Sequence, residues 1–456
     1  MHGRLLWPRK NLQTFRLRGN DIHNQADTEM IKSFLKRKYY NFLDSMTELL
    51  KTPRIKAYDR RIPEIEDRVF KKERIKVVFF VINIGMWKND DLFKLFLDSE
   101  RFDPYIVSFI YKHDSLDYKE YVQNEMRDYF KSKGFPFIKG YDVSSGKYFN
   151  LKAFKPDILL YAQPYNVERE EYKVMDYFHD CLFAYIPYCI AINDLPSLRN
   201  LFYKNICWKM FYPTRQSKEH EARYLTTRRD NIVVSGYTSA DYLTGTRKYS
   251  EKDWKPQNGS MRRIIWAPHH SILKNDLLDY SNFLEIADGM VGLAQKYSDR
   301  VQFAFKPHPR LMRKLYELEE WGKTRTDNYF DKWRTMPNTS FVDGEYYDLF
   351  LSSDAMIHDC CSFMIEYLFT RKPIMFVTGE KEKLMETMNM DARKSMELHY
   401  TGETLQDIEQ FINEVILEGK DPMRPLREDY YERELKTPGT GKVSQNIFDT
   451  FRTALR

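Results

Sequence analysis

The segment Ile75-Lys-Val-Val-Phe-Phe-Val-Ile82 is an almost continuous apolar run. A strand buried on both faces needs such a run, and strands of this kind occur in parallel sheets that helices cover. A turn, Asn83-Ile-Gly-Met-Trp-Lys88, follows the run, and a predicted helix extends from Asp90 to Leu97. The sequence therefore predicts an α/β fold in which strands and helices alternate.

The alternation continues toward the C-terminus in two blocks. In the first block helical segments such as Tyr118 to Lys133 separate most of the candidate strands, which are Tyr105 to Tyr111, Phe137 to Tyr141, Asp157 to Tyr161, Phe183 to Ile192, Met210 to Tyr212 and Asn231 to Ser235. The polar, turn-rich stretch 248–262 is typical of a linker. Beyond it, strands at 263–267, 301–306, 339–342, 355–358 and 373–377 alternate with helices at 282–297, 311–321, 346–352 and 361–370. We expect two Rossmann-like domains, 74–247 and 262–430, that face each other across a cleft.

The segments outside these domains are predicted to be helical. Residues 1–73 are rich in charge and carry apolar residues at helical spacing, which indicates an N-terminal helical extension. A final helical pair is predicted at 404–418 and 443–455, and residues 431–456 form the closing C-terminal helix. A single hydrophobic core stops growing beyond about 250–300 residues. Because the chain has 456 residues, we expect two domains with extensions.

The charge composition argues against a nucleic-acid partner. The chain has 72 Lys and Arg against 66 Asp and Glu, a net charge of only +6. Proteins that bind nucleic acid usually concentrate basic residues on one face. Basic stretches do occur at 36–38, 54–61 and 68–76. Each is either a solvated helix face or a surface that is attracted to an anionic membrane.

The cysteines and the apolar stretches of the chain indicate in which cellular compartment the protein is expected. The five cysteines, none at CxxC spacing, are typical of reduced thiols in a cytosolic protein. The longest apolar stretches, 77–82 and 181–192, are shorter than the roughly 18 residues that a spanning helix needs. The first eight residues lack a signal-type apolar region. We expect a cytoplasmic protein with at most peripheral contact at the inner face of the membrane.

Imidazole and small polar side chains follow several strands of the second block. Ligands of an open parallel sheet bind outside the carboxyl ends of its strands, so we expect one phosphate-handling site there. Its candidates are His269, His270, His308, Asp359 and Ser362. Ser362 is the first expected phosphate ligand, at a helix start whose free N–H groups attract an anion. The alternative is a serine that caps only its own helix.

Two further features refine this candidate site. His308 lies between two prolines, which restrict the backbone, so we expect a rigid catalytic or phosphate-binding imidazole. Glu366 either accepts a hydrogen bond from a ribose hydroxyl or lies at the surface. No spaced carboxylate completes a metal motif with His269 and His270, and the chain has no Asp-x-Asp element. Metal-independent transfer without a cofactor is therefore favoured.

The first domain offers weaker candidates for the acceptor side. Gly85 either lets an acceptor approach the backbone or belongs to an ordinary strand-to-helix turn. Trp87 and Tyr188 follow other predicted strands. Asp194 is a candidate general base.

The second-domain motifs resemble those of the CDP-glycerol glycerophosphotransferase family, the teichoic-acid primases and polymerases. The resemblance covers residues 231–450 and rests on Gly236-Tyr237 with Asp241, Ala267-Pro268-His269, Lys306-Pro-His308, Asp359-Cys-Cys-Ser362-Phe-Met-Ile-Glu366, Lys372-Pro-Ile-Met-Phe376 and Gly441-Lys442-Val443-Ser444. It implies a GT-B fold. It also implies that the second domain binds a CDP-activated donor through Pro268, His269, His270, Lys306, Asp359, Cys361, Ser362 and Glu366.

The sequence departs from the family pattern at three places. Cys361 replaces the first of two serines, and Ser271 stands where the family usually has an arginine. The family's Trp-His-Gly element, whose histidine acts as the base, has no match, and Ile186-Pro-Tyr188-Cys189 occupies its place.

The resemblance implies a transferase that moves glycerol phosphate, or a related polyol phosphate, from a CDP-activated donor. The expected acceptor is a hydroxyl of a cell-surface glycan or polyprenyl-linked precursor. One alternative is a GT-B glycosyltransferase that uses a nucleotide-sugar. A second is a catalytically degenerate scaffold, suggested by the missing Trp-His-Gly element.

Overall fold

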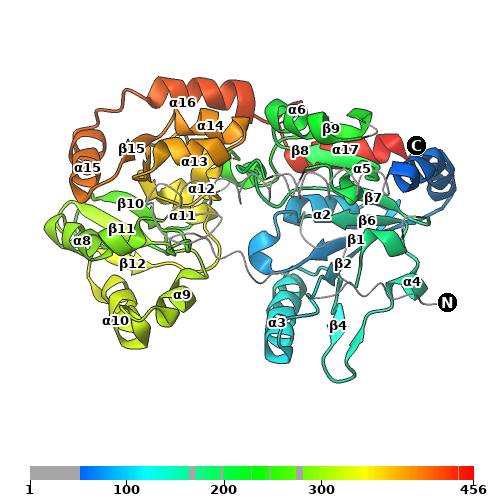
Figure 1. Ribbon diagram of the computed structural model, residues 1–456, viewed down its shortest axis with the longest axis horizontal. Helices are drawn as coiled ribbons and strands as arrows, with labels where there is room; N and C mark the ends of the chain where they lie inside the picture. The colour runs from blue at the N-terminus through cyan, green and yellow to red at the C-terminus, as the bar shows by residue number, and fades with distance from the viewer. Residues whose placement is uncertain are drawn as a thin grey trace, which may run out of the picture. The chain divides into compact units, whose positions relative to one another are not determined.

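Two parallel β-sheets organise the computed structural model (Figure 1). The structure describes residues 52–163, 171–177, 179–195, 199–226, 229–245, 248–273, 281–439 and 441–455. The chain divides into two units, Met1–Arg54 and Ile55–Arg456, and both sheets belong to the second. Residues 1–51 of the predicted N-terminal extension lie outside the described residues.

The first sheet has seven strands in the order β3-β2-β1-β6-β7-β8-β9. They are β1 (Ile75–Val81), β2 (Phe102–Ser108), β3 (Phe137–Ile138), β6 (Ile158–Tyr161), β7 (Leu182–Tyr185), β8 (Lys209–Tyr212) and β9 (Ile232–Val234). Its helices include α2 (Asp90–Leu97), α3 (Leu116–Ser132), α4 (Leu151–Phe154), α5 (Phe202–Asn205), α6 (Arg215–Tyr224) and α7 (Ala240–Leu243). A two-stranded hairpin, β4 (Tyr141–Asp142) with β5 (Lys147–Tyr148), follows β3.

The second sheet has six strands in the order β12-β11-β10-β13-β14-β15. They are β10 (Arg262–Ala267), β11 (Val301–Phe305), β12 (Thr339–Phe341), β13 (Ala355–His358), β14 (Ile374–Val377) and β15 (Tyr400–Gly402). The helices between them are α8 (Phe283–Lys296), α9 (Leu311–Glu317), α10 (Gly322–Thr335), α11 (Tyr347–Ser352), α12 (Phe363–Glu366), α13 (Lys381–Thr387) and α14 (Met390–Met396). This is the 3-2-1-4-5-6 order of a Rossmann sheet. The strand order reverses between β10 and β13, and that switch point is where such folds bind ligands.

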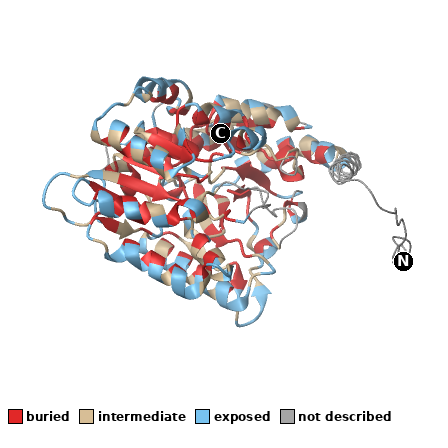
Figure 2. Cartoon of the chain, turned by 60° about the vertical axis from the view of Figure 1, so that its left-hand side comes forward, coloured by how far each residue is buried: buried red, intermediate tan, exposed pale blue. Residues whose placement is uncertain are grey.

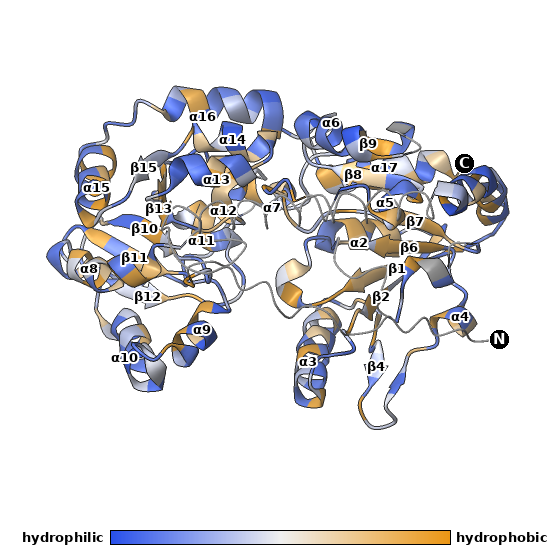
Figure 3. Cartoon of the chain, in the orientation of Figure 1, coloured by the Kyte–Doolittle hydropathy of each residue, from blue (hydrophilic) through white to orange (hydrophobic). Residues whose placement is uncertain are grey.

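Burial follows the apolar runs. Every residue of β1 except Lys76 is buried, as the sequence pattern predicts. Figure 3 shows hydrophobic residues along β1, β6 and β7, and Figure 2 shows that strand residues are largely buried. In the second sheet Trp266, Phe305 and Trp333 stack at the centre of the core, with Trp266 and Phe305 ring centroids 4.9 Å apart. No helix in the described part of the chain combines the length and the apolar character needed to cross a bilayer.

Several predicted elements differ from the structure. The strand predicted at 183–192 ends at Tyr185, because Pro187 has no N–H to continue a ladder. Helix α10 was not predicted, although its buried residues Thr326, Tyr329, Phe330 and Trp333 follow a helical period. The helix predicted at 361–370 is α-helical only over Phe363–Glu366 and continues as a 3-10 helix, Tyr367–Thr370.

The C-terminal region is helical and returns to the first sheet. Its helices are α15 (Leu405–Gln410) with a π-helical continuation (Phe411–Leu417), α16 (Arg424–Tyr430) with a π-helical continuation (Tyr431–Leu435), and α17 (Val443–Ala454). The predicted domain boundary at residue 430 falls inside the continuous helical stretch of α16. Phe451 of α17 packs its ring against Phe96, Trp208 and Phe211 of the first domain. The closing helix therefore completes the core of the first sheet.

Candidate functional site

The candidate site lies where β10 and β13 end side by side. Ala267, the last residue of β10, pairs with His358, the last residue of β13. The loop after β10 therefore begins beside Asp359. The backbone N–H of His308, in the loop after β11, donates to the carbonyl oxygen of Pro268 over 2.9 Å. Three strand ends are thus joined at the switch point of the sheet.

Asp359 holds two of these segments together. It is buried, and its carboxylate accepts hydrogen bonds from the backbone N–H of His269, the Ser281 hydroxyl and the backbone N–H of Asn282, at 2.5, 2.8 and 2.9 Å. Burial raises the pKa of Asp359 to about 7, against the lowering effect of these donors. We assign it to positioning the loop that carries the histidines.

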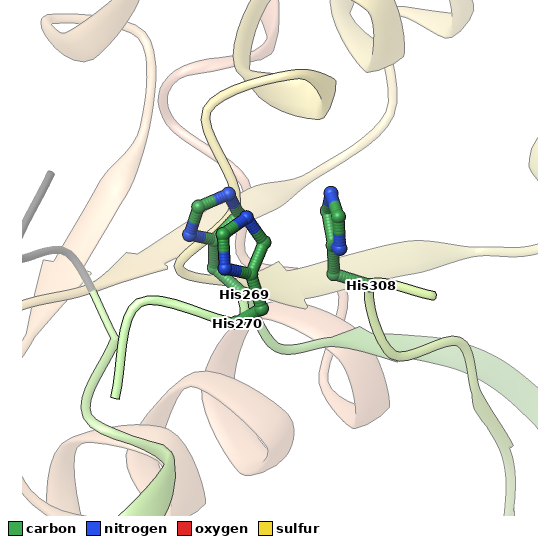
Figure 4. Close-up of side chains that lie close together, drawn as sticks. All are labelled: His269, His270 and His308. Carbon is green, nitrogen blue, oxygen red and sulfur yellow. The ribbon is translucent and has the colours of Figure 1, made fainter. Parts of the chain in front are cut away.

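The three histidines form a cluster (Figure 4). Ring centroids of His269 and His270 are 4.3 Å apart, those of His270 and His308 4.2 Å, and those of His269 and His308 5.1 Å. The Sγ atom of Cys361 lies 3.9 Å from Nε2 of His269. The start of α12 therefore borders the imidazoles.

Backbone contacts set the tautomer of two of these rings. The N–H of Arg310 donates to Nδ1 of His308 over 3.1 Å, and the N–H of Ser271 donates to Nδ1 of His269 over 3.3 Å. A neutral imidazole that accepts at Nδ1 carries its proton on Nε2. Both rings therefore carry their proton on Nε2, and the Nε2 atom of His269 lies beside Sγ of Cys361.

Both rings are also held neutral. Burial, with the neighbouring histidines, lowers the pKa of His308 to about 2, and burial with His270 lowers the pKa of His269 to about 3. At neutral pH they are uncharged N–H donors. Such donors suit a phosphate oxygen.

The three imidazoles could also hold a metal ion. One ring nitrogen of each histidine lies within 4.8 Å of the ring nitrogens of the other two. Imidazole nitrogen is a preferred Zn²⁺ ligand. A metal bound through Nε2 of His308 would require the proton to move to Nδ1, where the Arg310 N–H already donates. The backbone therefore favours an anion over a metal at this ring.

Cys361 and Ser362 lie between β13 and α12. Ser362 is exposed, and its side chain makes no capping hydrogen bond to α12, so it is not the helix-capping serine of the alternative interpretation. Cys361 is partly buried. Lys306, two residues before His308, is buried with its backbone N–H bonded to the Trp266 carbonyl.

Glu366 is not a surface residue. It is buried, and its two oxygens accept hydrogen bonds from the hydroxyls of Tyr237 and Tyr346, at 3.1 and 2.8 Å. Burial raises its pKa, while Lys88 lowers it. Because Tyr237 and Tyr346 flank it, Glu366 connects the segment after β9 to the segment after β12.

Lys88 and Tyr346 are not among the site residues that the sequence predicts. The Nζ atom of Lys88 donates to the Tyr346 hydroxyl over 3.1 Å and lies 4.7 Å from the centre of its ring. Lys88 lies in the turn after β1, and Tyr346 lies in the segment after β12, so both residues meet the strand-end criterion that selected the other candidates.

The acceptor-side candidates differ in how far they are exposed to solvent. Gly85 is exposed in a 3-10 turn, Ile84–Met86. Tyr188 is half-buried, and its carbonyl accepts from Tyr237. Trp87, in contrast, is buried against Phe93, and its indole N–H donates to Asp90. The expectation that Trp87 faces an acceptor is therefore wrong, because this side chain belongs to the core.

Asp194 does not have the properties of a general base. It forms an ion pair with Arg199, 2.6 Å away, and lies 3.3 Å from His220. Burial alone would raise its pKa, but Arg199 and His220 lower it below the ordinary value. A base needs a pKa near the working pH, so this ion pairing opposes the predicted role.

A family model matches residues 209–451 and is described as CDP-glycerol:poly(glycerophosphate) glycerophosphotransferase. No curated protein sequence matches the chain. A histidine-to-asparagine variant of the wall teichoic acid polymerase TagF is a similar solved structure, at 14% identity over 92% of this chain and 98% of that chain, with a TM-score of 0.53.

Two further solved structures are similar. Methanocaldococcus jannaschii UDP-GlcNAc 2-epimerase, in complex with UDP-GlcNAc and UDP, matches at 14% identity over 83% of this chain and 99% of that chain, with a TM-score of 0.53. MnaA from S. aureus with UDP matches at 14% identity over 84% and 97%, with a TM-score of 0.52. At this identity the likenesses show the fold, which is of the predicted GT-B type.

Proposed function

Since this chain belongs to the CDP-glycerol:poly(glycerophosphate) glycerophosphotransferase family, we propose that it transfers glycerol phosphate, or a related polyol phosphate, from a CDP-activated donor. The proposed acceptor is a hydroxyl of a cell-surface glycan or of a polyprenyl-linked precursor. The family match supports the glycerophosphotransferase activity. The identities of the donor and of the acceptor are proposals.

The proposed reaction is an in-line displacement at the β-phosphorus of the donor. A new bond forms between the acceptor oxygen and phosphorus, and the bond from phosphorus to the bridging oxygen of the diphosphate breaks. CMP leaves with the electron pair of that bond, and the acceptor proton passes to a base. Positioning and charge stabilisation supply most of the acceleration in such transfers.

One observation carries this proposal. His269 and His308 follow two different strands at the switch point of the second sheet, their rings pack together, and each carries its proton on Nε2. A diphosphate has oxygens on both phosphates that accept hydrogen bonds. We place the donor diphosphate beside these imidazoles, with Ser362 and Cys361 at its edge.

The acceptor is proposed to approach from the first sheet, past Gly85 and Tyr188. If it is lipid-linked, the protein works in the cytoplasm at the inner face of the membrane. Sedimentation with vesicles of anionic and of neutral lipid tests this contact. Equal recovery with both lipids would argue against an electrostatic attachment.

Ligand-dependent stability and turnover test the donor. A true donor stabilises the folded protein by mass action, so CDP-glycerol is expected to raise the melting temperature more than UDP-GlcNAc or a CMP-sugar. CMP release is then followed with an acceptor present. A stronger effect of a nucleotide-sugar would favour the glycosyltransferase alternative, and binding without turnover would favour the scaffold.

Variants test the site. His308→Ala and Ser362→Ala are expected to lower donor affinity and turnover, while His113→Ala serves as a control because His113 is exposed. If both variants bind and turn over like the unmodified protein, the diphosphate does not lie beside His308 and Ser362.

A further inference from the structure

Lys306 is a buried cation that has no partner among the residues that the structure describes. Only 4% of the residue is exposed, and its Nζ atom forms no hydrogen bond or ion pair with any residue in the described ranges. Burial lowers the pKa of this amine, although Asp343 and Asp253 act in the opposite direction. A buried charge is costly unless something pairs with it. Lys306 therefore has the properties of a group whose partner is an anionic ligand.

Lys88 is a second buried cation, and it lies between β1 of the first sheet and α2. The residue is 8% exposed, and its Nζ atom forms no ion pair with a described carboxylate. It contacts the Tyr346 hydroxyl and lies 5.0 Å from the centre of the Tyr347 ring. Both oxygens of Glu366, the nearby acid, accept from tyrosine hydroxyls. Aromatic rings and a hydroxyl hold the Lys88 ammonium while leaving donor capacity.

A chain of contacts connects the two lysines around the start of α12. The Tyr346 ring, beside Lys88, lies 4.9 Å from the ring of Phe363, which directly follows Ser362. On the other side Cys361 is next to His269, whose ring packs on that of His308. Lys306 precedes His308 by two residues. The charge of Lys88 is also among the causes that lower the pKa of Lys306, as expected of amines that lie near each other.

We propose that Lys88 and Lys306 bind the two phosphates of a nucleoside diphosphate from opposite sheets, with the Nε2–H groups of His269 and His308 as neutral donors between them. The proposal rests on the proposed function for the identity of the nucleotide.

Binding of inorganic pyrophosphate and of CDP to the full chain tests the proposal by calorimetry. Lys306→Met and Lys88→Met remove the charge and keep most of the side-chain volume. Each is expected to weaken pyrophosphate binding by about 10- to 100-fold, the usual effect of losing a hydrogen bond to a charged group. Unchanged affinity in Lys88→Met would show that the first sheet does not contact the diphosphate and would overturn the proposal.

A matched control is Lys372→Met. Lys372 is partly buried, and its Nζ atom donates to the carbonyl oxygens of Phe350, Leu351 and Ser353. Its replacement is expected to lower the melting temperature without changing the affinity of the folded protein for pyrophosphate. An equal loss of affinity in this control would mean that the effects are not specific to the proposed pair.

Stability without ligand separates a ligand-binding lysine from a structural one. Because burial desolvates the Lys306 ammonium and no described side chain pairs with it, Lys306→Met is expected to raise the melting temperature of the ligand-free protein while it weakens pyrophosphate binding. A fall in melting temperature with unchanged affinity would assign Lys306 a structural role and contradict the proposal.

The outcomes for this inference and for the proposed function are distinguishable. If the lysine variants lose pyrophosphate affinity but CDP-glycerol is not the preferred nucleotide, the diphosphate site stands and the proposed donor fails. If CDP-glycerol is preferred and the lysine variants bind it normally, the donor stands and the two-lysine site fails. Zn²⁺ that binds stoichiometrically and blocks pyrophosphate in the unmodified protein, but not in His308→Ala, would show a metal site in place of the proposed anion site.

Discussion

The backbone N–H of Arg310 donates a hydrogen bond to Nδ1 of His308 over 3.1 Å. This contact fixes the neutral ring with its proton on Nε2. His308 can therefore donate to an oxyanion but cannot accept a proton at Nε2 from an acceptor hydroxyl. The base of the proposed transfer must be another group.

The tautomer predicts different effects for two amide substitutions. His308→Gln places an amide N–H near the original Nε2 position, whereas the shorter side chain of His308→Asn does not reach it. We expect His308→Asn to weaken CDP binding by about 2- to 10-fold, the usual effect of losing one neutral hydrogen bond, and His308→Gln to retain most of the affinity. Calorimetric titration with CDP measures both. Equal losses in the two variants would contradict an Nε2–H donor.

Buried histidines predict a loss of stability in acid. His399 is buried, and burial lowers its pKa to about 4. Between pH 6.5 and 4 the unfolded chain takes up a proton there and the folded chain does not, so stability falls as the pH falls. The slope is about 1.4 kcal/mol per pH unit for each such histidine.

Denaturant unfolding at pH 7, 6 and 5 measures this slope in the unmodified protein and in His399→Gln. The variant is expected to lose less stability between pH 6 and 5, because one proton-binding difference is removed. The same pH dependence in both proteins would show that His399 binds its proton equally well in the folded and unfolded states, and would contradict the lowered pKa.

Two glycines of α8 predict opposite effects of the same substitution. A Cβ atom on Gly289 would overlap the side chain of Leu405, so Gly289→Ala forces Leu405 at the start of α15 to shift, with a cost of about 1–3 kcal/mol. A Cβ atom on Gly292 meets no atom of the described chain within 4 Å. Gly292→Ala should stabilise the protein by about 0.5–1 kcal/mol. Thermal melts compare the two, and a stabilising Gly289→Ala would mean that α15 moves away at little cost.

Asp241 attaches the closing helix to the first domain. Its carboxylate accepts from the backbone N–H groups of Val443 and Ser444, at 2.7 and 2.9 Å, at the N-terminus of α17. An anion is favoured at this end of a helix. Asp241→Ala is expected to cost about 1–3 kcal/mol of unfolding free energy. Asp299→Ala, at an exposed aspartate, is the control, and an equal effect of both would rule out this role for Asp241.

The strand pattern was largely predictable because it is local. A strand covered on both faces must be apolar along its length, and β1 and β13 show this in sequence. The strand-end criterion placed His269, His308 and Asp359 together, because parallel strands end at one edge. Prediction failed where tertiary packing decided the outcome. Trp87 satisfies the same criterion and is nevertheless buried, since the aromatic core of the first domain accommodates it.

The alternation of helices and strands, and the imidazoles that follow the strands of the second sheet, could be recognised in the amino-acid order because both are local features. Folding decided that those imidazoles are neutral, because burial among neighbouring elements lowers the pKa of His269 and His308. It also decided the partners of Lys88 and Lys306. Lys88 and Tyr346 are 258 residues apart in the chain, and no local pattern predicts contacts that form only when two sheets pack together.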